Sequence, residues 1–222
     1  MIKNILAAAA IGVVALGAQA APLVSNGSFD GTYADGSYVY NGVPDSVVAN
    51  YSGTVPTLAG TVDGWDGSFV SIASNSGPWG NPSGLANFSA SQGNWVAGVQ
   101  ADATLSQTLN LAAGTYRLTW VDANRGDNQS YAVSFDGGTV SYLDSTSFGT
   151  TAGTGWKTEQ LVFTTTGGTG ALTFAGGTIW GQSDSTSFID NVKLSAVPES
   201  SSLLMMVIGT LGLVAWRRRS QI

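Results

Sequence analysis

Through much of the chain, hydrophobic and polar residues alternate with the two-residue period of a half-buried β-strand. Tyr116, Leu118 and Trp120 fall on one face of such a run, and mostly polar residues separate them. Successive side chains of a strand point to opposite faces, so each run would place one face in a core. The same pattern recurs in Tyr131, Val133 and Phe135, in Leu161 and Phe163, and in Leu172 and Phe174.

Glycine-containing turn sequences separate these runs, at residues 112–114, 136–138, 166–168 and 175–177. Asp-Gly and Gly-Gly supply the positive φ that tight hairpins need. No stretch between residues 21 and 196 sustains the 3.6-residue period of an amphipathic helix. Many short strands at this spacing predict an all-β sandwich. Two stretches, 33–58 and 72–85, are rich in Gly, Ser, Asn and Pro and are expected to be loops.

Residues 1–20 have the pattern of a secretory signal peptide. Lys3 precedes an apolar stretch over residues 5–16, and residues 18–20 have the small-x-small form of a cleavage site. We expect signal peptidase to cut between Ala20 and Ala21, and the alternative is an uncleaved anchor helix. The predicted export would place the chain in a compartment that permits disulfides, although it contains no Cys.

The C-terminal segment predicts one short transmembrane helix. Residues 203–216 are apolar and uncharged, and three arginines follow at once. A helix of this length rises about 21 Å, less than the roughly 30 Å of a bilayer core. Trp216 at the interface and snorkelling arginine side chains would extend the span. By the positive-inside rule, Arg217, Arg218 and Arg219 would stay cytoplasmic and the body of the protein would lie outside.

Val197, Pro198 and Glu199 precede this helix, and the three-part arrangement resembles the PEP-CTERM sorting signal of Gram-negative bacteria, here residues 197–219. Ser200 stands where that motif usually has Pro. The resemblance implies processing by an exosortase-type membrane protease or transpeptidase after a transient stay in the inner membrane. It also implies a mature protein at the cell envelope, cell surface or extracellular matrix. The alternative is an ordinary tail anchor with a chance Pro-Glu pair.

The intervening body, residues 21–196, is acidic, with four Lys or Arg against thirteen Asp or Glu and a net charge of −9. The whole chain has −6, because the tail carries three arginines. Nucleic-acid binding needs clustered cations, so we expect no nucleic-acid partner. The chain has no His and no Cys, which excludes Ser-His-Asp triads, thiolate nucleophiles and imidazole or thiolate metal ligands.

Several short segments of the body occur in a characteristic order: residues 23–30 (LVSNGSFD), 64–65, 105–109, 114–118 and 188–194. Together they resemble galactose-binding-like jelly rolls, including carbohydrate-binding modules and the plant DUF642 proteins. The usual opening, Asn-Gly-x-Phe-Glu, stands here as Asn26 to Phe29 followed by Asp30. The resemblance implies an all-β, jelly-roll β-sandwich over residues 21–196 with a carbohydrate ligand.

The same resemblance implies a structural Ca²⁺ near the first and last strands. Asp30 and Asp190 hold the matching positions. Ca²⁺ takes about six to eight oxygen ligands, so two Asp with backbone carbonyls and water would suffice. The alternative is that Asp30 is a turn residue and that Asp190 caps or pairs locally.

Aromatic rings in glycine-rich stretches are the candidate sugar contacts. Trp79, Trp180 and Tyr38 lie in such stretches, and the apolar face of a sugar can stack on exposed rings. Simple packing is the alternative for each of them. By contrast, Trp95, Trp120 and Trp156 begin strands or fall in phase with core positions and are expected to be packed.

Catalysis is the least favoured interpretation. Asp63 with Asp66, and Asp122 with Asp127, could act on a glycosidic bond, which takes two carboxylates. However, Asp is expected at turns, and the body contains a single Glu and no G-x-S-x-G sequence. We therefore predict an exported, noncatalytic surface or matrix protein that binds carbohydrate, such as exopolysaccharide. A purely structural or adhesive protein, and then a carbohydrate-active hydrolase or lyase, remain the alternatives.

Overall fold

The computed structural model describes residues 22–29, 38–41, 64–73, 95–124, 129–150, 155–177 and 186–198. Within these ranges the regular structure is entirely β. The strands are β1 (Tyr38–Asn41), β2 (Asp66–Ala73), β3 (Trp95–Gln100), β4 (Thr104–Leu111), β5 (Gly114–Asn124), β6 (Gln129–Phe135), β7 (Val140–Tyr142), β8 (Ser147–Thr150), β9 (Lys157–Thr165), β10 (Gly168–Gly176) and β11 (Thr186–Ala196).

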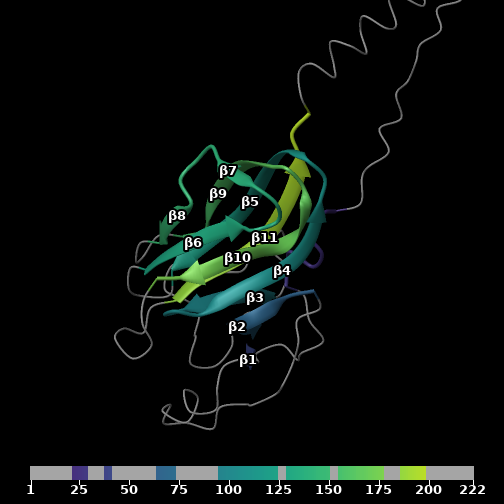
Figure 1. The fold of residues 1–222 in the computed structure, drawn as a ribbon. Helices are drawn as coiled ribbons and strands as arrows, with labels where there is room; N and C mark the ends of the chain where they lie inside the picture. The colour runs from purple at the N-terminus through teal and green to yellow at the C-terminus, as the bar shows by residue number, and fades with distance from the viewer. Residues whose placement is uncertain are drawn as a thin grey trace, which may run out of the picture.

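The strands form two packed antiparallel sheets (Figure 1). Sheet A has the order β7-β9-β5-β11-β3-β2-β1, and sheet B has the order β2-β4-β10-β6-β8. Strand β2 belongs to both sheets, because its first three residues pair with β4 and its last four pair with β3. The predicted all-β jelly-roll sandwich is thereby confirmed for the described residues.

The core fills the space between the sheets with aromatic side chains. The Phe174 ring of β10 lies 5.4 Å from Trp120 of β5 and 6.4 Å from both Trp65 and Tyr131, measured between ring centroids. Trp95 and Trp120 are buried, as their positions in the sequence predicted, whereas Trp156 is half-buried. Because such rings are large, each contact removes much apolar surface from water.

Strand β3 and the first half of β11 break the expected alternation. All six residues of β3 and residues 186–190 of β11 are buried. Ala97 and Ile189, which are register partners, belong to the main core. Val96 and Phe188 fall on the opposite face and are buried there. Sheet A is therefore buried on both faces at β3 and at the first half of β11. A continuous apolar run such as Trp95–Val99 is typical of a strand that is buried on both faces.

Part of the predicted loop region is also strand. Residues 38–41, inside the stretch 33–58, form β1, and residues 72 and 73, at the start of the stretch 72–85, end β2. These short segments gain backbone hydrogen bonds from neighbours distant in sequence, which composition alone does not reveal. The predicted signal peptide lies outside the described residues, as does the predicted tail helix. Within the described ranges, no helix is long and apolar enough to cross a membrane.

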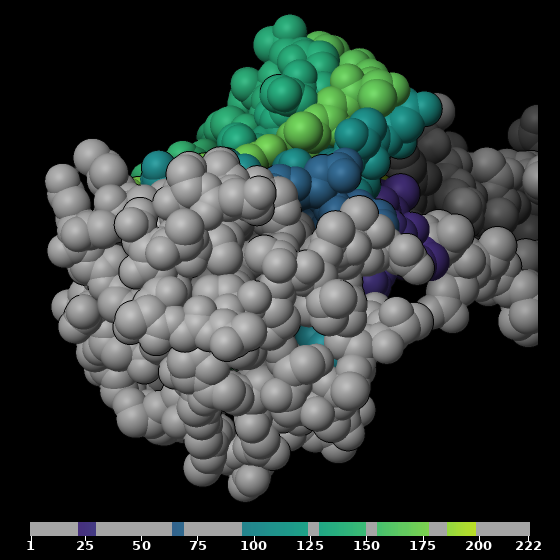
Figure 2. Space-filling view, turned by 90° about the horizontal axis from the view of Figure 1, so that it is seen from below, coloured from purple at the N-terminus to yellow at the C-terminus, as the bar shows by residue number. Residues whose placement is uncertain are grey.

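The opening segment, residues 22–29, lies beside the residues at the start of β2 (Figure 2). A backbone hydrogen bond also joins it to β11. The Asn26 carbonyl accepts hydrogen bonds from the Phe29 amide at 3.1 Å and from the Trp65 indole at 2.9 Å. Asn26 adopts a positive φ of 44°, which Asn tolerates better than most residues. Phe29 is fully buried, and its ring lies 5.1 Å from that of Trp65. The opening motif therefore has a structural role.

Gln107 of β4 ties this segment into sheet B. Its amide oxygen accepts a hydrogen bond from the Ser25 amide, and its amide nitrogen donates to the carbonyls of Ser25 and Gly64, each at 2.9 Å. Gln107 is buried, so these bonds satisfy a side chain that would otherwise be costly in the interior. The chain contains no disulfide-forming residue, and hydrogen bonds of this kind hold its opening segment in place.

Gly27 is required where the opening segment meets the last strand. The Val192 amide donates to the Gly27 carbonyl at 2.8 Å, and a Cβ on Gly27 would overlap the Val192 carbonyl. We therefore expect Gly27→Ala to lower the free energy of unfolding by about 1–3 kcal/mol, as overpacked sites do. Denaturant unfolding measures the change.

Gly149→Ala is the matched control for this substitution. A Cβ on Gly149 would meet only the Gln129 carbonyl at 3.8 Å, an ordinary contact. We expect the control to change stability by less than about 1 kcal/mol. Equal losses in the two variants would show that close approach at Gly27 is not what the opening motif requires.

Candidate functional site

The predicted calcium position lies where the opening segment meets β11. The register of β11 shifts between Asp190 and Lys193, and Asn191 has a φ of 55°. Asp190 is fully buried, and its Oδ1 accepts a hydrogen bond from the Asn191 amide at 2.6 Å. Asp30 lies just outside the described residues, directly after Phe29. The two regions named by the resemblance thus meet, through Val192 and Gly27.

A cation site at this point is not made by the described residues alone. They contain no group of three or more acidic side chains placed to hold a metal. Asp190 supplies one buried carboxylate whose Oδ1 already accepts a backbone hydrogen bond. The local capping by Asp190, the alternative to a metal ligand, is therefore present in the structure.

The other predicted site residues fall at the margins of the described chain. Tyr38 lies in β1 opposite Ile72. Val197 continues the pairing of β11, because its amide donates to the Thr115 carbonyl at 2.8 Å, and Pro198 is exposed. The remaining predicted residues are outside the described part: Ala20, Ala21, Trp79, Trp180, Glu199, Arg217, Arg218 and Arg219.

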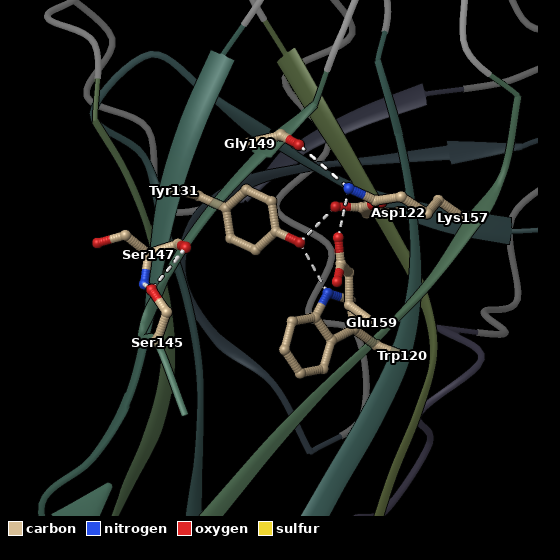
Figure 3. A network of polar contacts seen from close by, with 8 residues as sticks. All are labelled: Trp120, Asp122, Tyr131, Ser145, Ser147, Gly149, Lys157 and Glu159. Carbon is tan, nitrogen blue, oxygen red and sulfur yellow. Dashed lines mark hydrogen bonds and ion pairs between the residues drawn. The ribbon is translucent and has the colours of Figure 1, made fainter. Parts of the chain in front are cut away.

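A buried polar network lies at one end of the sandwich, where β5, β6, β8 and β9 meet (Figure 3). The Trp120 indole donates to the Tyr131 hydroxyl at 2.7 Å, and that hydroxyl donates to Asp122 Oδ2 at 2.6 Å. All three residues are buried. The Phe148 ring packs edge-on against Trp120 and stacks with Tyr131, which closes this network on the side of β8.

Lys157 and Glu159 border the network nearer to solvent. They form an ion pair, and the Lys157 ammonium also donates to the Gly149 carbonyl at 3.4 Å. In the β5–β9 register, Lys157 is the partner of Asp122 and Glu159 is the partner of Trp120. The Lys157 side chain is 53% exposed and that of Glu159 is 18% exposed, so the pair itself contributes little to stability.

Burial governs the charge of this network. It raises the pKa of Asp122 to about 6, against the lowering effects of the Tyr131 hydrogen bond and of Lys157. Burial, together with the Asp122 carboxylate, raises the pKa of Tyr131, so the phenol stays protonated and donates. The hydrogen bond to Glu159 raises the pKa of Lys157, which stays charged.

The residue types suggest Asp122 only as a possible catalytic partner of Asp127, and they do not reveal this network. The signal was present, because Asp122 continues the two-residue period of Tyr116, Leu118 and Trp120 and so faces the core. Its Oδ1 is buried without a hydrogen bond within the described chain. The Asp122 carboxylate is buried and hydrogen-bonded to Tyr131, so a polymeric substrate could not contact it. Its role is to hold the two sheets of the sandwich together.

Over β4, β6, β8 and β10 the outer face of sheet B carries no charged side chain, and the exposed Asp66 of β2 lies at its border, beside Ser106. The side chains of this face on β4, β6, β8 and β10 are small and mostly carry hydroxyl groups. They are Thr104, Ser106, Thr108, Asn110, Ser130, Ala132, Ser134, Ser147, Gly149, Thr169, Ala171, Thr173 and Ala175. Each is exposed or half-buried. The outer face of sheet A differs, because it carries the exposed cations Arg117 and Lys193.

No family model matches the chain, and no curated protein matches it. Solved structures similar to it include carbohydrate-binding modules. TmCBM61, in complex with beta-1,4-galactotriose, is 18% identical over 61% of this chain and 90% of that one, with a TM-score of 0.39. The module CBM36, in complex with calcium and xylotriose, is 19% identical over 45% and 79%, with a TM-score of 0.36.

A family 35 carbohydrate-binding module from Clostridium thermocellum is also similar. It is 16% identical over 50% of this chain and 83% of that one, with a TM-score of 0.36. Similarities at this level of identity assign no functional site to this chain.

The raised pKa of Asp122 makes a prediction for stability. An unfolded Asp has a pKa near 4, so the folded chain holds this proton more tightly and its stability falls as pH rises from about 4 to about 6. Asp122→Asn cannot ionise and keeps an oxygen for the Tyr131 hydroxyl. Its free energy of unfolding, relative to wild type, should rise by about 1–2 kcal/mol between pH 4 and pH 7, measured by denaturant unfolding.

Two further variants identify the cause. Tyr131→Phe removes a hydrogen bond that lowers the pKa of Asp122, so it should move the affected pH range upward. Asp102→Asn makes the same chemical change at an exposed position and controls for the loss of one negative charge. If the difference between Asp122→Asn and wild type does not depend on pH, the buried carboxylate does not limit stability.

Proposed function

We propose that this chain is an exported surface or matrix protein whose sandwich binds a neutral polysaccharide without catalysis. The observation that carries the proposal is the outer face of sheet B, an exposed surface of hydroxyl and small side chains with no charged group over β4, β6, β8 and β10. Hydroxyl and amide groups can exchange hydrogen bonds with sugar hydroxyls, directly or through water.

The chemistry of this face disfavours other partner classes. Nucleic acids and anionic polysaccharides need cations, and the face offers none in a body with a net charge of −9. Protein interfaces of high affinity centre on aromatic and arginine anchors, which are also missing from this surface. A neutral, hydroxyl-rich polymer requires neither feature and can contact several strands at once.

The same proposal places the protein at the cell surface. Signal peptidase would release residues 21–222, the segment 203–216 would hold the precursor in the inner membrane, and an exosortase-type enzyme would process the tail near Pro198 and Glu199. At a surface, many copies would act together, so an affinity of about 10 μM to 1 mM for one site would be sufficient.

Binding to the outer face of sheet B is tested by adding a charge there. Thr108 is exposed on β4 beside Ala171 of β10. We expect Thr108→Glu to weaken binding to a neutral polysaccharide about tenfold, the effect of about 1.4 kcal/mol, because the carboxylate would lose water without gaining a partner. Affinity electrophoresis in gels containing neutral or acidic polysaccharides measures the loss.

Gln160→Glu adds the same charge to an exposed position on the outer face of sheet A and is the matched control. Equal affinities of both variants and wild type would exclude the face of sheet B. Loss of binding in Trp79→Ala, Trp180→Ala or Tyr38→Ala would then place the contact at the aromatic residues that the sequence suggests. The absence of binding to every polysaccharide would favour a purely adhesive or structural protein.

We also propose a structural Ca²⁺ at the junction of the opening segment and β11, with Asp190 and Asp30 as carboxylate ligands. The support is the full burial of Asp190 beside the Gly27–Val192 contact. A ligand that binds only the folded state stabilises it. EDTA should therefore lower the melting temperature by several degrees, and added Ca²⁺ should restore it.

Asp190→Asn should abolish most of the response to Ca²⁺, and Asp102→Asn, at an exposed position, should leave it intact. A melting temperature that neither EDTA nor Ca²⁺ changes would mean that Asp190 acts only as a local cap for the Asn191 amide.

A further inference from the structure

Three turns pack together at the end of the sandwich where the chain leaves β11. They join β4 to β5 at residues 112–113, β6 to β7 at 136–139, and β9 to β10 at 166–167. The Thr139 amide donates to Thr166 Oγ1 at 2.9 Å, and the Thr166 amide donates to the Thr139 carbonyl at 3.1 Å. A Cβ on Gly167 would lie 2.7 Å from the Ala113 amide nitrogen. We call these residues the turn end.

The C-terminal segment leaves the sandwich beside the turn end. Strand β11 runs from Thr186 to Ala196, and the Val197 amide still bonds the Thr115 carbonyl near the start of β5 (Figure 1). Only residues 198–202 then separate the sandwich from the apolar stretch that begins at Leu203. Fully extended, five residues span at most about 18 Å. The strands β5 and β11 have 11 residues each, a length of about 37 Å.

Charge is distributed unevenly along the sandwich. Within the turn end, Asp136 is the one charged residue, and its Oδ1 accepts a hydrogen bond from the Ala171 amide at 2.6 Å. On the strands that lead to this end, Arg117 is paired with Ser195, and the carboxylate of Asp144 accepts a hydrogen bond from the amide of Val162, the β9 partner of Arg117. Lys193 lies at mid-length, paired with Thr119. The opposite end contains Asp102, Asp122 and Glu159, accompanied by Lys157.

We infer that the turn end faces the lipid surface while the tail anchors the chain, so that the sandwich stands with its acidic end away from the membrane. The inference rests on the proposed membrane insertion of residues 203–216. The short connection brings the turn end within about 18 Å of the lipid. An anionic lipid surface repels carboxylates, and the larger number of them at the opposite end favours the same orientation.

This orientation has a consequence for the ligand surface. The outer face of sheet B runs along the strands and would stand at a steep angle to the membrane. A polymer could then contact this face without meeting the lipid. The small, nearly uncharged turn end would occupy the membrane side, where a polysaccharide has no access.

Single-cysteine variants can test the orientation, because the chain contains no Cys. Thr139→Cys marks the turn end, Ser130→Cys marks the opposite end of β6, and Gln160→Cys marks the outer face of sheet A; all three positions are exposed. The full chain with its tail intact, labelled with a fluorophore, is placed in phosphatidylethanolamine and phosphatidylglycerol vesicles. A nitroxide on a fraction of the lipid headgroups quenches nearby labels.

We expect quenching at position 139 to exceed that at position 130 at least about twofold, because these labels lie roughly 20 Å apart along the strands. Position 160 should be intermediate. Inserting about 20 Gly and Ser residues between Ser201 and Ser202 adds a flexible coil of about 25 Å and should largely remove the difference.

Flotation of the vesicles in a density gradient shows whether the chain is bound to them. If it is bound, two results of the quenching measurement would overturn the inference. Equal quenching at positions 139 and 130 would mean that the sandwich has no fixed orientation. Stronger quenching at position 160 than at 139 would mean that it lies on the outer face of sheet A. If the chain does not float with the vesicles at all, the proposed membrane insertion fails and the orientation fails with it.

Discussion

The sandwich depends on how its first described residues are joined to its last strand. The backbone of Gly27 accepts a hydrogen bond from Val192, and Gln107 holds Ser25 and Gly64 from the other sheet. Together with the burial of Phe29 against Trp65, these contacts link both sheets and both ends of the body. In a chain without Cys, such contacts take the place of a covalent link, and each loses its effect if the backbones move apart.

The network of Trp120, Tyr131 and Asp122 joins the two sheets a second time, between β5 and β6. There the constraint is electrostatic, because a buried carboxylate is tolerated only through the hydroxyl that donates to it and the ammonium of Lys157 nearby. Hydrophobic residues could fill this space at lower cost in desolvation. The polar arrangement fixes β5 of sheet A relative to β6 of sheet B, since a displacement of either strand would separate Asp122 from Tyr131.

Local pattern was sufficient to predict the strands that face water on one side. The alternation in β5, β6, β9 and β10 follows directly from a sheet with one buried face. It was insufficient for β3 and the first half of β11, which are buried on both faces by contacts distant in sequence. The residue type of Asp122 suggested a turn, whereas its phase with Trp120, which the sequence interpretation did not use, places it in the core.

The candidate site shows the same division between local and long-range information. The opening motif determines backbone conformation and packing, as the positive φ of Asn26 and the close approach of Gly27 to Val192 show. It carries less information about a ligand, which depends on what the exposed surfaces present. Those surfaces emerge only when four strands place single Ser and Thr residues, unremarkable in sequence, side by side on sheet B. The proposed ligand surface therefore follows from topology, and a search for conspicuous aromatic residues alone would overlook it.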